Sequence, residues 1–226
     1  MALWLGRFAG RAGQMSADEI TPEGITALFT RGAGDYLFAR WGRPIVPVVF
    51  GVDDATLATV KGAIEAVVAL AGHRMAGTDP ELGANLMVFF LRDWAELLEV
   101  PNLGRLLDGL EPLVARLQAA DANQYRVFRF DAAGAIRAAF VFVRMDDALR
   151  EVPAATLALS QAVQVIVLWS DAAFRGASPL ALVEGVAVLR PEIAAVIRAA
   201  YDPVLPAASR EPGHGLRLAA RAGRLI

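Results

Sequence analysis

The feature that most constrains this chain is a long stretch without a charged side chain, residues 152–170. Its length comes near the roughly 20 apolar residues that a membrane span requires. However, it begins near Pro153 and carries side chains that form hydrogen bonds: Thr156, Ser160, Gln161 and Gln164. Such groups would find no water to bind within lipid. We therefore expect a buried helix at about 153–169 that faces a cleft of a folded domain, and no transmembrane span.

The composition of the whole chain excludes several classes of function. The 226 residues suffice for one large domain, and 56% of them are hydrophobic. A formal net charge of -2 does not provide the basic surface that nucleic acids require, so no nucleic-acid partner is expected. The chain has no cysteine and only two histidines, His73 and His214, which excludes thiolate chemistry and leaves few ligands for a transition metal. We expect no cofactor.

The two ends of the chain differ in composition from its centre. We expect residues 1–20 to be poorly structured or to form a short helix, and 21–206 to form a single domain. Residues 207–226 are expected to form an arginine-rich tail, flexible or packed at the periphery. No apolar core of a secretory signal is visible near the N-terminus, which favours a cytoplasmic location. Trp4 and Phe8, together with the tail, leave a peripheral membrane contact open.

Hydrophobic periodicity predicts a mixture of strands and helices. The prolines of 43–51 favour a strand at a sheet edge, and 85–91 is apolar enough for a strand covered on both faces. A glycine-containing turn predicts a hairpin of 124–130 with 135–144. Helices are expected at about 54–70, 93–100, 103–118 and 191–200, whereas 178–189 is ambiguous. This order predicts an α+β fold, with helices covering a mostly antiparallel or mixed sheet.

Residues 160–171, SQAVQVIVLWSD, carry a further signal. They resemble the motif His-Glu-x-x-Gln-x-x-Gly-Leu-x-Asn-Asp of a zincin-like, peptidase-related bacterial family of unknown function, common in alphaproteobacteria (domain of unknown function 2927). Ser160 stands at the His position and Gln161 at the Glu position. Three positions match the motif: Gln164, Leu168 and Asp171.

Other segments that resemble the same family follow in the same order. They are 40–44 (RWGRP), 84–86 (ANL), 134–136 (GAI) and 201–203 (YDP). The resemblance extends over roughly residues 36–206 and implies a zincin-like domain. It also implies a location outside the cytoplasm, in conflict with what the N-terminus favours. The residues after Pro203 depart from the pattern of the family.

The chemistry of a zincin depends on residues that this motif lacks. Two histidines at positions i and i+4 of a helix bind zinc, and a glutamate beside the first acts as general base. A hydroxyl and an amide oxygen are poor zinc ligands, and an amide cannot accept a proton. We therefore predict no catalytic residue and no metal ligand. The candidates for a degenerate site or cleft are Ser160, Gln161, Gln164, Asp171, Tyr201 and Asp202.

Two interpretations of the polar side chains on this helix stay open. They can form hydrogen bonds inside the protein, to the neighbouring sheet or to residues 201–202. Alternatively, they can line a ligand-binding cleft at the position where a zincin has its active site. For the whole chain, the first hypothesis is a non-catalytic binding or scaffolding protein with a protein partner. The alternatives are a hydrolase that uses non-standard residues in the same cleft and a peripheral membrane protein.

Overall fold

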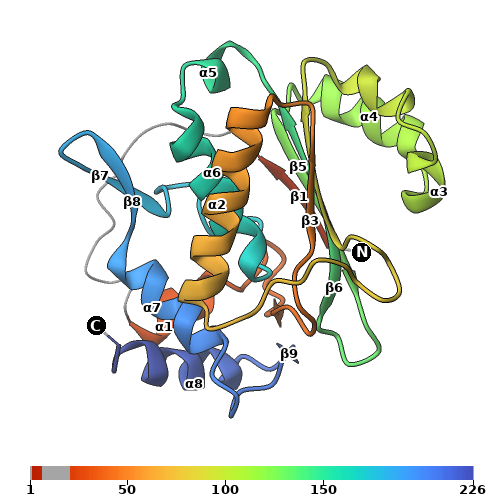
Figure 1. The fold of residues 1–226 in the computed structure, drawn as a ribbon. Coiled ribbons are helices and arrows are strands. Elements are labelled where there is room, and N and C mark those ends of the chain that lie inside the picture. The colour runs from red at the N-terminus through yellow and green to blue at the C-terminus, as the bar shows by residue number, and fades with distance from the viewer. Residues whose placement is uncertain (1, 7–20, 226) are drawn as a thin grey trace.

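The structure, a computed structural model, describes residues 2–6 and 21–225. At its centre is a five-stranded sheet (Figure 1). In spatial order its strands are β1 (Ala2–Gly6), β5 (Gln124–Phe130), β6 (Ile136–Arg144), β4 (Leu86–Leu91) and β3 (Pro47–Phe50). β3, β4 and β6 run parallel, whereas β5 is antiparallel to both of its neighbours. The expected α+β class with a mixed sheet is confirmed.

Two long helices, α2 (Asp54–Leu70) and α6 (Ala154–Ile166), pack against each other on one face of this sheet (Figure 1). α2 begins behind Asp53, whose side chain accepts a hydrogen bond of 2.7 Å from the backbone N–H of Thr56. Its buried residues recur at the predicted spacing: Val60, Ile64, Val67 and Val68. Three more helices contribute to the same core: α1 (Pro22–Ala27), α5 (Asp147–Arg150) and α7 (Pro191–Ala200).

A smaller group of elements covers part of the opposite face: η2 (Trp94–Leu98), α3 (Leu103–Leu106) and α4 (Leu110–Ala119). The prediction of one helix over 103–118 is wrong, because the backbone is extended at Leu107 and left-handed at Gly109 (φ 70°). The helix predicted at 93–100 is a short 3-10 helix.

Two short sheets lie outside the central one. β2 (Phe38–Ala39) pairs with β9 (Ala208–Ser209). β7 (Leu180–Val183) and β8 (Val186–Leu189) form the antiparallel hairpin that occupies the ambiguous region 178–189. Its turn residues Glu184 and Gly185 both have positive φ, 51° and 82°, as in tight turns that match the twist of the strands. The hairpin projects from the body of the molecule on the side away from α3 and α4 (Figure 1).

Regular secondary structure is found near both ends of the chain. Residues 2–6 form a strand rather than a helix, and 7–20 lie outside the described residues, Phe8 among them. The arginine-rich tail, expected to be flexible or packed at the periphery, forms α8 (Gly213–Ala222), which packs against α1 and α7 and buries His214. In the described part of the chain, no helix is both long enough and apolar enough to span a membrane.

Candidate functional site

Helix α6 holds the motif residues in the interior of the protein. It begins after Pro153, as predicted, but ends at Ile166 instead of near Trp169. The helix ends there because the backbone becomes extended and Leu168 donates its N–H to the carbonyl oxygen of Ala39 over 2.8 Å. The chain after the motif helix is therefore tied to β2.

The three polar motif residues are buried. The exposed fractions of Ser160, Gln161 and Gln164 are 0%, 3% and 8%. Gln164 donates through Nε2 to Oγ of Ser160 over 2.9 Å, one helical turn away. The pair thus satisfies part of its hydrogen-bonding capacity within the helix itself.

A nucleophilic serine requires a base in contact with its hydroxyl. His73 instead donates from Nε2 to the carbonyl oxygen of Arg43 over 2.8 Å. Nδ1 of His214 shares a hydrogen bond of 2.7 Å with the hydroxyl of Tyr36. Both histidines of the chain are therefore bonded to other groups, and neither activates Ser160.

Gln161 belongs to a buried cluster that α6 shares with β5. Its Nε2 donates to Oε1 of Gln124 over 3.0 Å, and its own Oε1 accepts a hydrogen bond from Arg126. Arg126 also donates to Oε1 of Gln124 over 2.8 Å. Gln124 and Arg126 lie two positions apart on a strand, so both side chains point to the face that α6 covers. Both polar ends of the Gln161 side chain are occupied by the protein.

This cluster carries a buried positive charge. Burial lowers the pKa of the Arg126 guanidinium to about 9, so it is still protonated at neutral pH. The oxygens of Gln124 and Gln161 serve as its acceptors. The guanidinium is thus bonded to the same two amide side chains that join α6 to β5.

Three aromatic side chains satisfy backbone carbonyls at the C-terminal end of α6, which a helix leaves without internal partners. The pairs are Trp169 Nε1 with Val163 (2.8 Å), Trp41 Nε1 with Val165 (2.9 Å) and the Tyr201 hydroxyl with Ile166 (2.7 Å). Burial raises the pKa of Tyr201, so its hydroxyl keeps the proton that it donates. The sequence indicated Tyr201 as a cleft residue and the tryptophans as core. Their shared role at one helix end was missed.

The two carboxylates among the candidates lie apart from the α6 cluster. Asp171 accepts from the backbone N–H of Gly32 over 3.2 Å and forms an ion pair of 2.8 Å with Arg175. Asp202 accepts from the backbone N–H of Val204 and from Nε of Arg221, over 2.8 Å and 2.7 Å, and both bonds lower its pKa. The six candidates therefore do not form one site. On α6, Ser160 pairs with Gln164, whereas Gln161 bonds β5. Tyr201 bonds the C-terminal end of α6, and each of the two aspartates pairs with an arginine.

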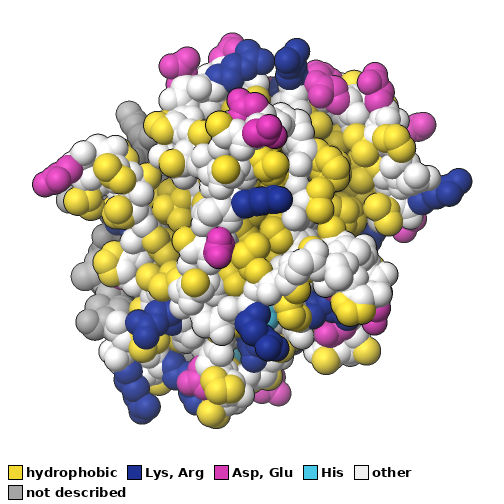
Figure 2. Space-filling view, in the orientation of Figure 1, with side chains coloured by type: hydrophobic (Ala, Val, Ile, Leu, Met, Phe, Trp, Pro, Cys, Tyr) yellow, Lys and Arg dark blue, Asp and Glu magenta, His cyan; other side chains and the backbone are white. Residues whose placement is uncertain are grey.

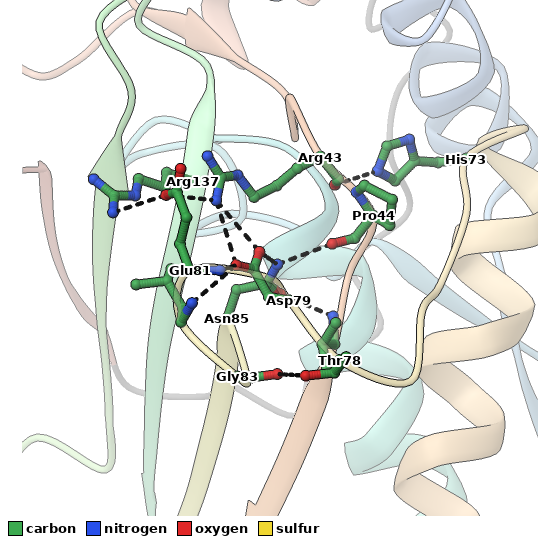
Figure 3. A network of polar contacts seen from close by, with 11 residues as sticks. Arg43, Pro44, His73, Thr78, Asp79, Glu81, Gly83, Asn85 and Arg137 are labelled. Atoms are coloured by element: carbon green, nitrogen blue, oxygen red, sulfur yellow. Dashed lines mark hydrogen bonds and ion pairs between the residues drawn. The ribbon is translucent and has the colours of Figure 1, made fainter.

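A second polar network, at the start of β3 and β4, was not predicted (Figure 3). Asp79 accepts hydrogen bonds from the backbone N–H of Glu81 (2.9 Å) and Leu82 (3.0 Å), from Nδ2 of Asn85 (3.0 Å) and from Arg43 (3.3 Å). Burial by itself would raise the pKa of Asp79, but these donors together hold it at about 2. The carboxylate is therefore ionised and fully engaged, which suits a structural group better than a general base.

Asn85 connects this network to the sheet. Its Oδ1 accepts from the backbone N–H of Val46 over 2.8 Å, and its Nδ2 also donates to the carbonyl oxygen of Pro44 over 2.9 Å. The side chain is completely buried. Asn85 thereby fixes the entrance of β3 against β4, which explains why a polar residue precedes an apolar strand.

An apolar groove lies on the face of the sheet opposite α6, where α3 and α4 leave it open. It consists of two adjoining hollows of about 460 Å³ and 670 Å³ that share Phe50, Met87 and Leu106. The exposed fractions of Phe50 and Leu106 are 45% and 50%, and Phe50 stacks on Phe89 with 4.7 Å between ring centroids. Figure 2 shows hydrophobic side chains gathered between α2 and the α3–α4 region.

Charged side chains stand at the two ends of this groove. Arg129 and Arg137 line the smaller hollow, and Glu96 and Glu99 line the larger one. Arg129 donates to the carbonyl oxygen of Leu106 over 2.7 Å. The groove is therefore apolar along its middle, basic at one end and acidic at the other. Sequence patterns did not reveal it, because its residues come from strands and loops that are distant in the chain.

Within the described residues, no three side chains of His, Asp or Glu come together in a way that could hold a metal ion. Comparisons with protein families, curated proteins and solved structures found no match for this chain. The likeness to zincin-like proteins therefore rests on the motif residues alone.

Proposed function

We propose that this protein is a zincin-like binding or scaffolding module that performs no catalysis. The observation that carries the proposal is the cluster of Gln161 with Gln124 and Arg126. A working zincin would present a carboxylate at this motif position to a metal-bound water. Here an amide occupies it, and both ends of that amide bond β5 inside the core.

The burial of Ser160 supports the same conclusion. A hydrolase with a non-standard nucleophile would need the hydroxyl of Ser160 within reach of its substrate. The side chain is fully buried and accepts a hydrogen bond from Gln164. A substrate would have to displace the packing of α6 before any chemistry started.

We assign binding to the apolar groove instead. Large hydrophobic side chains that line a hollow on the surface are unusual in a monomer and mark interaction sites. Phe50 and Leu106 meet this description, and the volumes of the two hollows fall within the roughly 300–1,000 Å³ that is typical of binding pockets. The charges at the two ends would orient a protein partner along the groove.

Site-specific crosslinking tests this assignment. A photoreactive residue at position 106 should give a defined protein adduct in cells that express the chain. The same residue at position 61, an exposed site on α2 away from the groove, should give none. Absence of any adduct that depends on position 106 would overturn the assignment of the groove.

Elemental analysis and an activity screen test the other half of the proposal. The purified protein should hold no stoichiometric zinc and should hydrolyse no peptide or ester substrate. Stoichiometric zinc, or a hydrolytic activity that Ser160→Ala abolishes in a folded protein, would overturn the non-catalytic assignment and favour the hydrolase alternative.

A further inference from the structure

We propose that the groove accepts the β7–β8 hairpin of a second copy of this chain, so that copies assemble head to tail. The inference rests on the proposed binding function of the groove and names its occupant. It follows from two surfaces that are complementary in apolar character and in charge.

The first surface is the tip of the hairpin. The exposed fractions of Leu182, Val183 and Val186 are 63%, 55% and 62%, which makes the tip one of the most exposed apolar features of the described residues. Glu184 stands between them at the turn and has no ion pair within the described part of the chain. An unpaired carboxylate amid apolar side chains disfavours insertion into lipid and favours a protein surface that offers a cation.

The second surface is the basic end of the groove. Arg129 makes a hydrogen bond to a carbonyl oxygen but forms no ion pair among the described residues. Arg137 pairs with Glu81 over 3.1 Å, and the Glu81 side chain is more than half exposed, so this ion pair contributes little to stability. Both arginines adjoin Phe50 and Leu106, which would contact the apolar side chains of the incoming tip. The groove thus offers Glu184 the cations that its own molecule does not provide.

The positions of the two surfaces determine how copies would assemble. The hairpin projects from one side of the molecule, and β3 and α3 lie on the other side (Figure 1). A chain therefore cannot insert its own hairpin into its own groove. Contact between different patches on identical chains is heterologous, and it continues into rings or open chains.

Two variants each disrupt one of the two contact surfaces, the hairpin tip or the groove. Leu182→Lys places a cation on the hairpin that the arginines repel, and Leu106→Glu places a charge in the apolar groove. Both positions are at least half exposed, so the fold should tolerate these changes. Val204→Lys is the control, because it removes an exposed apolar side chain that belongs to neither surface. If circular dichroism shows that Leu106→Glu does not fold, Phe50→Ser takes its place.

Sedimentation velocity of the full chain over a series of concentrations is the measurement. We expect wild type and Val204→Lys to form species larger than a dimer, and Leu182→Lys and Leu106→Glu each to remain monomeric. An equal mixture of these two variants should form a dimer and nothing larger, because one intact hairpin meets one intact groove. A wild type that is monomeric at every concentration, or a mixture that stays monomeric, would overturn the inference.

Crosslinking at position 106 distinguishes two negative results: that copies of the chain do not assemble, and that the groove binds no partner at all. An adduct with twice the mass of the chain supports the inference. An adduct with a different protein, together with a monomeric wild type, overturns the inference but leaves the groove as a binding site. No adduct at all overturns both.

Discussion

Gln161 on α6 donates a hydrogen bond of 3.0 Å to Gln124 on β5, and both residues accept from the buried Arg126. The motif position at which a zincin would hold its general base is therefore part of the contact between a helix and a sheet. The buried polar residues of this helix have hydrogen-bond partners, as buried polar groups must: Gln164 bonds Ser160 within the helix, and Gln161 bonds β5.

The hydroxyl of Tyr201 should contribute measurably to stability. Tyr201→Phe leaves the carbonyl of Ile166 without its donor, and we expect the free energy of unfolding to fall by about 1–3 kcal/mol. Denaturant titration followed by circular dichroism measures this loss. Tyr125→Phe is the control with a smaller expected loss, because among the described residues the Tyr125 hydroxyl has only a long contact of 3.4 Å with Arg116. Equal losses in the two variants would contradict a special role for Tyr201 at the end of α6.

Local patterns predicted much of the fold. The periodicity of α2, the apolar run of β4 and the glycine turn between β5 and β6 each depend on neighbouring residues, and all three predictions are confirmed. The failures concern long-range contacts. For 207–226 the sequence left a flexible tail and a peripherally packed one open and did not predict the helix α8, because its packing against α1 and the burial of His214 are long-range contacts.

The candidate site was predicted only in part for the same reason. Ser160, Gln161 and Gln164 were expected on one buried helix and are found there. Their partners Gln124 and Arg126 come from a strand whose sequence looks like an ordinary hairpin arm. No spacing rule connects residue 126 with residue 161, because the contact exists only after the helix docks on the sheet.

Asp79 should matter more for stability than its exposed neighbour Glu81. Asp79→Ala removes the acceptor for two backbone N–H groups and for Asn85, and we expect a loss of about 1.5–3 kcal/mol in the free energy of unfolding. Glu81→Ala removes surface ion pairs only and should cost less than about 1 kcal/mol. Thermal unfolding of both variants tests whether Asp79→Ala loses more stability than Glu81→Ala. A larger loss for Glu81→Ala would show that the buried network is unimportant.

His214 should make the fold sensitive to acid. Burial, and then the nearby Arg217 and Arg221, lower the pKa of His214 to about 4, below the roughly 6.5 of an unfolded histidine. The unfolded state therefore binds more protons between about pH 6.5 and pH 4. Stability is full above this window and falls as the pH decreases through it, by at most about 1.4 kcal/mol per pH unit.

Burial also lowers the pKa of His73, so His73 adds to the acid sensitivity of the fold. Wild type and His214→Gln both contain His73, and the difference between them therefore reports the contribution of His214. The measurement is the free energy of unfolding between about pH 7 and pH 4. We expect the wild type to lose more stability than the variant over this range. Parallel curves would contradict the assignment to His214.

The most direct test of the account is a double-mutant cycle between Gln161 and Gln124, measured by equilibrium unfolding. Each single change to alanine removes the hydrogen bond between α6 and β5, so the two effects should not add. We predict a coupling energy of about 0.5–3 kcal/mol and a clear loss of stability for Gln161→Ala alone. Additive effects, with Gln161→Ala as stable as the wild type, would show that Gln161 is not a structural residue of the core.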